Sequence, residues 1–413
     1  MRLTTKVFLA TLAIGCAPSQ PAAVSPQPSE PSVLSRQPSD TLPPDSIRVL
    51  VSRLDLERYK ATIKGLTQFG DRRQGTARNR AAVDWIEAQL KSYGCTNTER
   101  IKYEYTGRQL RLPGDTTRRR AAPPARPNPN PPKGFRGPTG VNTDSLRQPN
   151  LELRRINAEP DTPGQREEVF CTKIGSTRPG EMYILGAHMD GHGFGAAAND
   201  DGSGTALVME LARILSAPDV ETDVSIRFAL WNNEETGLNG ARAYVDERQA
   251  LQGKESPAGS GKYPEPKWLG MIQHDMMLFD HGMPGPDGKV SPEQRREADV
   301  NIEFQTNSKM AAESQRLAWT VKAANEKYAT DYPAAVGPHM TNTDSTPFMD
   351  IVPSISLREN ERGAQIGGGW DPHWHQPTDV FSTFSDADFR LGLNAAQTTL
   401  GALGQLAGAT VKE

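Results

Sequence analysis

The chain has 413 residues, a formal net charge of −3 at pH 7 and 36% hydrophobic residues. This length is enough for one large domain or two modest ones, and the apolar content allows a sizeable core. A charge so close to neutral gives no reason to expect nucleic acid as a partner. The chain contains only three cysteines, which excludes a small fold held together by disulfides.

The N-terminus has the pattern of an export signal over residues 1–15. Arg2 and Lys6 give a positive start, and the apolar run that follows is too short to span a bilayer. The run ends in Leu-Ala-Ile-Gly-Cys, which resembles a bacterial lipobox with Cys16 as the acylated residue, although Ala13 stands where such motifs usually have Leu. We therefore expect an exported protein with a lipid anchor in the bacterial cell envelope, in the periplasm or at the outer membrane. The alternative is an ordinary cleaved signal peptide with an incidental cysteine.

Two further segments have compositions that cannot form a core. Residues 16–45 are rich in Pro, Ser and Gln and are predicted to be a tether. Residues 107–149 contain three consecutive arginines, many prolines and almost no large apolar residue, which predicts a disordered basic insertion. Such an insertion could contact anionic lipid heads or cell-wall polymers, and a solvated loop is the simpler interpretation. We expect a single folded domain over 46–413 around it.

Apolar periodicity predicts alternating helices and strands in that domain. Helices are expected from about Asp45 and from about Arg78 to a stop at Gly94, followed by a strand over 99–105. From residue 150 onward, further strands are expected at 182–187, 224–231, 268–273 and 353–357, with a helix at 204–215. Alternation of this kind is typical of an α/β sandwich with a mostly parallel central sheet and helices on both faces.

Side chains that can bind metal ions follow the first three of these later strands. His188 and Asp190 come after the first, Glu234 and Glu235 after the second, and Asp275 after the third. Open α/β sheets place their ligands beyond the carboxyl ends of the strands, so these residues are expected to meet in one crevice.

Two more segments can contribute to the same crevice. Asp200 lies in a turn that leads into a helix, and His375 lies in a loop near the C-terminus. Carboxylate and imidazole ligands without thiolates suit a hydrolytic site for zinc or a related divalent metal. A two-metal site needs a bridging carboxylate with further ligands on each side, and this set of residues supplies them.

Five motifs resemble the secreted di-zinc aminopeptidases, a family related to glutamate carboxypeptidases and glutaminyl cyclases. In chain order they are AHMDGHG, ANDDGSG, LWNNEETGLNGA, QHDMM and HWHQPTD. The upstream segment FGDRRQGTARNRAAVDWIEAQLKSYG also resembles the N-terminal helical region of that family, so the likeness covers about 60–106 and 150–400. It implies a zinc-exopeptidase fold, a sandwich of the phosphorylase/hydrolase type.

The resemblance also implies a role for each residue of the crevice. Two zinc ions, or related divalent metals, are expected to be held by five ligands: Asp200 as the bridge, Glu235 and His375 on one metal, and His188 and Asp275 on the other. Glu234 is implied as the general base. The Asp190 side chain would hydrogen-bond the His188 imidazole and fix its tautomer. The peptide bond between Asp200 and Asp201 is often cis in such proteins.

The predicted activity is the removal of N-terminal residues from peptide substrates. A carboxypeptidase or dipeptidase on the same scaffold is an alternative, and it would need Arg358 or Arg362 to hold a substrate carboxylate. A glutaminyl cyclase is disfavoured by the full ligand set, because cyclases usually work with one metal. A non-catalytic binding protein is disfavoured because such relatives lose ligands.

Some residues depart from the family pattern or fall outside it. Trp374 stands where relatives often have a Tyr that could assist the oxyanion. Four extra histidines near the motifs are expected to be exposed or locally hydrogen-bonded: His192, His274, His339 and His373. Cys95 and Cys171 are expected either to pair in an oxidising compartment or to serve as isolated small apolar residues.

Overall fold

The structure is a computed structural model that describes residues 45–107, 140–279, 300–338, 342–359 and 371–412. The expected signal peptide, Cys16, almost all of the tether and the central part of the basic insertion lie outside the described residues. The same is true of His339 and Arg362.

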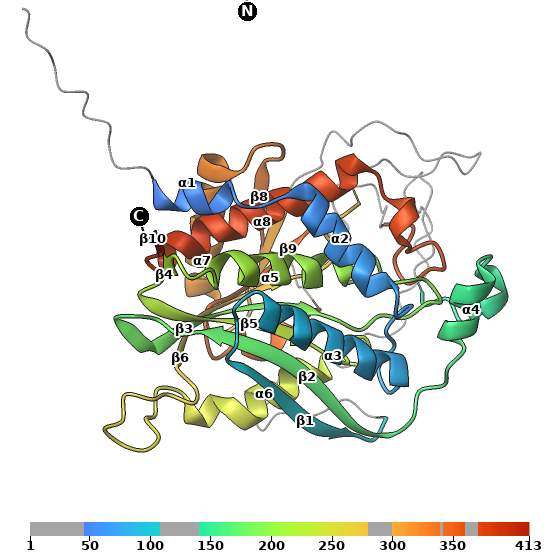
Figure 1. Ribbon diagram of the computed structural model, residues 1–413, viewed down its shortest axis with the longest axis horizontal. Helices are drawn as coiled ribbons and strands as arrows, with labels where there is room; N and C mark the ends of the chain where they lie inside the picture. The colour runs from blue at the N-terminus through green and yellow to red at the C-terminus, as the bar shows by residue number, and fades with distance from the viewer. Residues whose placement is uncertain (1–44, 108–139, 280–299, 339–341, 360–370, 413) are drawn as a thin grey trace, which may run out of the picture. The chain divides into compact units, whose positions relative to one another are not determined.

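A mixed eight-stranded sheet forms the centre of the folded part (Figure 1). In spatial order its strands are β1 (Thr98–Tyr105), β2 (Gly164–Lys173), β5 (Val224–Trp231), β3 (Arg178–His188), β6 (Lys267–His274), β9 (Ser354–Arg358), β7 (Val300–Phe304) and β8 (Ala334–Gly337). The four middle strands β5, β3, β6 and β9 are parallel to one another, and so are β7 and β8. Antiparallel pairs join β1 to β2, β2 to β5 and β9 to β7. The mostly parallel sheet is therefore confirmed.

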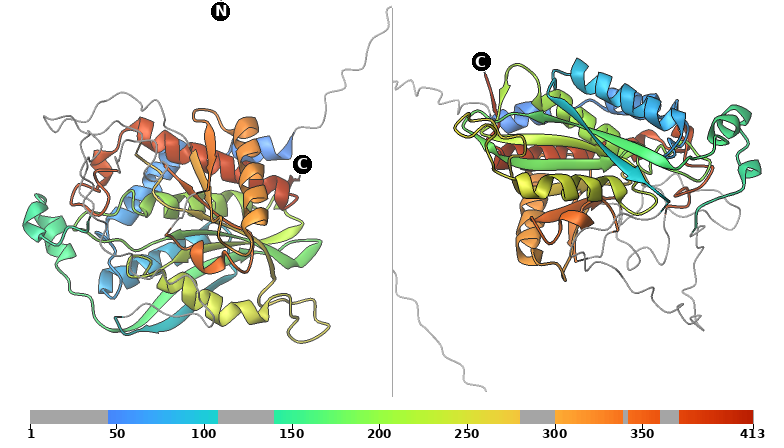
Figure 2. Two further views of the ribbon diagram at one scale, coloured as in Figure 1. Left: turned by 180° about the vertical axis from the view of Figure 1, so that it is seen from behind. Right: turned by 90° about the horizontal axis from the view of Figure 1, so that it is seen from below.

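Helices cover both faces of the sheet, as expected. They are α1 (Ser46–Val51), α2 (Leu56–Thr67), α3 (Ala77–Ser92), α4 (Leu151–Asn157), α5 (Gly202–Leu215), α6 (Asn239–Arg248), α7 (Ala311–Tyr328) and α8 (Asp386–Leu406). The larger apolar core joins α1, α2, α3, α5, α7 and α8 to one side of the sheet, and a smaller core packs α6 against the other. Figure 2 shows α3 and α6 on opposite sides of the strands.

Short elements complete the described part. A two-stranded ribbon pairs β4 (Val220–Glu221) with β10 (Thr410–Val411). Four 3-10 turns are η1 (Ser145–Arg147), η2 (Gln249–Leu251), η3 (Thr346–Phe348) and η4 (Phe381–Thr383). None of the described helices is both long and apolar enough to cross a membrane.

The elements nearest the site follow directly from their sequences. Every residue of β5 is buried, because both faces of this central strand are covered, and its run of apolar residues predicts its bounds correctly. Helix α3 begins where the Thr76 side chain accepts a hydrogen bond from the backbone N–H of Asn79. Gly94 follows its last turn with a φ of 88°, a left-handed conformation that glycine adopts without strain.

A disulfide joins Cys95, just after α3, to Cys171 on β2, with a Cα–Cα distance of 6.0 Å. The pairing of the two cysteines is therefore confirmed. The bond fixes the end of α3 to a strand that lies next to β5 in the sheet.

The expectation that all of residues 107–149 lack structure is wrong at their C-terminal end. Residues 145–147 form η1, and the flanking polar side chains bind loops beside the predicted site. The backbone N–H of Asn142 donates to the carbonyl of His375 at 3.0 Å, and its side chain donates to Gly193 at 3.2 Å. The Gln148 side chain donates to the carbonyls of Phe194 and Pro377. Composition did not reveal this order because the contacts are polar and distant in sequence.

Candidate metal centre

The five predicted ligand side chains come together beyond the carboxyl ends of three neighbouring strands. His188 is the last residue of β3, Glu235 follows β5, and Asp275 follows β6. Asp200 lies just before α5 and His375 in the loop that precedes α8. All five are buried or nearly so.

Asp200 lies between two pairs of side chains. Its Oδ1 is 3.2 Å from Nε2 of His188, and its Oδ2 is 3.0 Å from Nε2 of His375. His375 Nε2 is also 3.0 Å from Oε2 of Glu235, and His188 Nε2 is 3.8 Å from Oδ1 of Asp275. The two oxygens of one carboxylate thus face two different imidazoles.

The donor atoms at this centre fit a divalent metal ion. Oδ2 of Asp200, Nε2 of His375 and Oε1 of Glu235 are buried and make no hydrogen bond in the described part of the chain. Buried polar atoms normally have such a partner. Groups of three ligand atoms lie within 4.8 Å of one another here, and ligands at zinc bond lengths in a tetrahedron are about 3.4 Å apart.

The His188 ring is hydrogen-bonded to the backbone of Asp190 and not, as the resemblance implied, to its side chain. Nδ1 of His188 lies 3.0 Å from the backbone carbonyl oxygen of Asp190, whereas the Asp190 carboxylate is 3.9 Å away. An N–H at Nδ1 that donates to this carbonyl leaves Nε2 free to face Asp200. The carboxylate of Asp190 instead accepts the backbone N–H of Glu234 at 3.0 Å. Burial raises the pKa of Asp190 to about 6.

Glu234 is distinct from its neighbour Glu235. The ligand groups found among the described residues include Glu235 and do not include Glu234. Burial raises the pKa of Glu234 well above its usual value, and the negative charge of Glu235 adds to this effect, while His188 opposes it. Glu234 is thus a buried carboxyl group beside the cluster with a raised proton affinity.

Two aspartates that sequence reasoning did not single out position the ligand segments. Asp201 accepts the backbone N–H groups of His188 at 3.1 Å, Gly204 at 2.8 Å and Met276 at 3.2 Å. It therefore connects the ends of β3 and β6 to the start of α5, and the peptide bond that precedes it is cis, as the resemblance implied.

The second positioning residue is Asp379, whose carboxylate accepts the backbone N–H groups of Asn199 at 2.8 Å and Asp200 at 3.1 Å. Burial raises its pKa to about 8. Asp201 lies in the motif ANDDGSG and Asp379 in the motif HWHQPTD, so the sequence does carry a signal for both residues.

The extra histidines behave differently from one another. His274 is locally hydrogen-bonded, to the Gly186 carbonyl and the Thr399 hydroxyl, and burial lowers its pKa to about 4. The His373 ring nitrogen bonds to the Thr378 hydroxyl. His192 instead lies 3.0 Å from Oε2 of Glu235, at the edge of the cluster.

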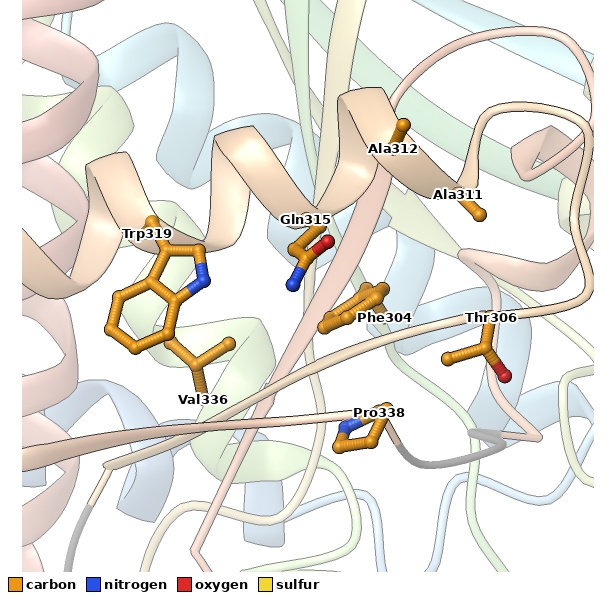
Figure 3. Close-up of a pocket in the computed structure, with 8 residues that line it drawn as sticks. All are labelled: Phe304, Thr306, Ala311, Ala312, Gln315, Trp319, Val336 and Pro338. Atoms are coloured by element: carbon orange, nitrogen blue, oxygen red, sulfur yellow. The ribbon is translucent and has the colours of Figure 1, made fainter.

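A separate cavity of about 440 Å³ lies between α7 and the strands β7 and β8. Figure 3 shows Trp319 and Gln315 of α7 opposite Val336 and Phe304. None of its eight lining residues carries a carboxylate, imidazole or thiol. It therefore lacks the groups that a hydrolytic site requires, and the acid and imidazole cluster is the candidate site.

Comparison with known proteins identifies the class. The sequence profile described as peptidase family M28 matches residues 170–397, which contain all five predicted ligands. The chain belongs to this family.

One relative shows how far the likeness extends along the chain. The chain is 27% identical over 276 residues to a Mycobacterium tuberculosis protein described as "Probable lipoprotein aminopeptidase LpqL", a match that covers 64% of this chain and 47% of that protein. The match thus spans about half the length of that relative.

Two solved structures share the fold. The zinc aminopeptidase BSAP from Bacillus subtilis has a TM-score of 0.57 at 14% identity, covering 87% of this chain and 96% of that one. A glutaminyl cyclase from Porphyromonas gingivalis has a TM-score of 0.53 at 16% identity, covering 86% and 99%.

Proposed function

We propose that the protein is a metal-dependent aminopeptidase with two zinc ions, or related divalent ions, and a Glu general base. The observation that carries the proposal is the position of Asp200, whose two carboxylate oxygens face His188 at 3.2 Å and His375 at 3.0 Å. A carboxylate in that position is the bridging ligand that a two-metal site requires. Asp275 would complete one metal and Glu235 the other.

The residues of the chain divide the chemistry between them. Bound zinc supplies Lewis acidity and lowers the pKa of water. Glu234, buried beside the cluster, accepts the proton of the attacking water and passes it to the leaving amine. The Asp190 carbonyl holds the His188 ring in the tautomer that presents Nε2 to the centre. The Asp190 carboxylate accepts a hydrogen bond from the backbone N–H of Glu234 and so fixes the position of the base.

The contacts of Arg358 argue against the carboxypeptidase alternative. Arg358 was one of two candidates to hold a substrate carboxylate, but it is only 2% exposed. Its Nη2 donates to Oδ2 of Asp275 at 2.6 Å, so its charge already supports a ligand. Arg362 lies outside the described residues.

For cellular location, we propose export and a lipid anchor at Cys16, with residues 16–45 as a tether and 46–413 as a single domain. The relative described as a lipoprotein aminopeptidase supports this proposal.

A panel of model substrates tests the activity. Peptides with a free N-terminus and a blocked C-terminus should be cleaved from the N-terminus, and a chelator should abolish cleavage until zinc is restored. Cleavage only of substrates with a free C-terminus would support the carboxypeptidase instead. Ammonia release from an N-terminal glutamine, without hydrolysis, would support a cyclase.

A further inference from the structure

A third imidazole faces the half of the centre that contains Glu235 and His375. Nε2 of His192 lies 3.0 Å from Oε2 of Glu235, the same distance that separates this oxygen from Nε2 of His375. Ligand atoms of the three residues lie within 4.8 Å of one another. The His192 and His375 rings pack edge to face with centroids 4.1 Å apart. His192 is therefore as close to Glu235 as an implied ligand is.

The contact between His192 and Glu235 does not have the geometry of a hydrogen bond. Nε2 of His192 is buried and has no hydrogen-bond partner among the described residues, although the side chain is 17% exposed. Nε2 of His375 is likewise buried and without a hydrogen-bond partner among the described residues. Two imidazole nitrogens that approach one carboxylate oxygen without bonding to it suggest a cation between them.

The backbone around His192 is closely packed on both sides. A Cβ at Gly191 would lie 2.9 Å from the carbonyl oxygen of Asp200, and one at Gly193 would lie 2.3 Å from that of His375. The two glycines allow the segment to pass between two implied ligand segments. The backbone on either side of His192 thus lies directly against two implied ligand segments.

We propose that His192 is a sixth protein ligand, on the same metal as Glu235, His375 and Oδ2 of Asp200. This inference rests on the proposed two-metal centre and makes the two sites unequal. One metal would have four protein ligands. The other would have three, namely His188, Asp275 and Oδ1 of Asp200. Four protein ligands are typical of closed zinc sites, and three of sites with an open position for water or substrate. The site that contains His192 should therefore bind its metal more tightly.

Metal affinity measured on two substitutions tests this assignment. His192→Ala removes the imidazole, and His192→Gln keeps a side-chain N–H that is able to donate to Glu235 while making a poor zinc ligand. Zinc content is measured after equilibration with graded chelator concentrations, and the cobalt-substituted proteins are examined by visible spectroscopy. Circular dichroism of the metal-free proteins shows whether each variant folds. His373→Ala is the matched control, because this histidine bonds to Thr378 and belongs to none of the ligand groups of the described residues.

The wild-type protein should release its two zinc ions at well-separated chelator concentrations. Both His192 variants should lose the tighter ion with an affinity reduced by more than about 100-fold, beyond the loss typical of a residue that only supports a ligand. Their cobalt spectra at one equivalent should change, and His373→Ala should match wild type.

If His192→Gln binds both ions as tightly as wild type, His192 only supports Glu235 and the assignment is overturned. If His192→Ala does not fold, the zinc affinity of His192→Gln alone tests whether His192 is a ligand. Failure of the proposed function would appear differently, as a wild-type protein that binds fewer than two zinc ions or does not cleave N-terminal substrates when loaded.

Discussion

The backbone of Gly193 passes so close to His375 that a Cβ at Gly193 would lie 2.3 Å from the His375 carbonyl oxygen. Gly193 also has a φ of 94°, which L-residues rarely adopt. Gly193→Ala should therefore displace His375, lower zinc affinity by about 10-fold or more and reduce activity. Gly253→Ala is the control, because its φ is also positive and its nearest neighbour would be 3.6 Å away. Equal zinc affinity in the two variants would contradict the prediction.

Glu234 and Glu235 follow the same strand, and substitutions of the two residues are predicted to have different effects. Glu234→Gln keeps the size of the side chain but cannot accept a proton from water. Its zinc content should remain near normal while kcat falls by about 10²–10⁴. Glu235→Ala should lose metal and stability as well as activity. Metal analysis beside steady-state kinetics decides the matter, and the reverse pattern would mean that the two roles are exchanged.

Arg358 is predicted to stabilise the fold through Asp275. In the metal-free protein, Arg358→Met leaves this buried carboxylate without the guanidinium that pairs with it, which should cost about 3–5 kcal/mol in the free energy of unfolding. Arg316→Met is the control, because its ion pair with Glu313 is exposed and should contribute at most about 1 kcal/mol. Urea denaturation of both variants measures the difference. A loss in Arg358→Met no larger than that of the control would show that the buried pair contributes little.

The disulfide between Cys95 and Cys171 closes a large loop of the chain and should stabilise the fold by limiting the unfolded state. Replacement of both cysteines by Ala should lower the free energy of unfolding by about 2–4 kcal/mol. A reducing agent should destabilise the wild type to a similar extent and leave the double variant unchanged. A double variant with wild-type stability would argue against this role.

Cys16 is predicted to carry the lipid that retains the protein at a membrane. Cys16→Ser should move the mature chain from the membrane fraction to the soluble fraction, as followed by fractionation and immunoblotting. Because the folded residues are unchanged, the released enzyme should keep its full specific activity. Retention of Cys16→Ser in the membrane fraction would exclude this anchor.

The strands that hold the ligands could be predicted because their sequences are locally informative. Six of the eight residues of β5 are apolar and the strand is buried on both faces, so the sequence predicts its bounds correctly despite the buried Arg227. Strand β2 did not stand out, because it contains Arg166 and Glu168, which are charged residues that become buried only when the fold supplies their surroundings. Pattern alone cannot indicate such a strand.

The sequence predicts which side chains of the candidate site lie together, but not their detailed contacts. The positions of the proposed ligands follow from motifs at strand ends and in two loops. Nδ1 of His188 is less than 1 Å closer to the backbone carbonyl oxygen of Asp190 than to its carboxylate, and this small difference decides which group accepts the hydrogen bond. The approach of His192 to Glu235 depends on a loop path between two glycines. Neither relationship has a sequence pattern that separates it from its alternatives.

Nearly half of the chain separates His188 from His375, the two imidazoles that face the Asp200 carboxylate. During synthesis the first half of the centre is therefore present long before the second, and a nascent chain cannot close the site around Asp200 until residue 375 has been made. Zinc capture at full affinity therefore requires synthesis to have passed residue 375. Metal loading should report the joining of segments that are distant in the chain and not the folding of any local segment.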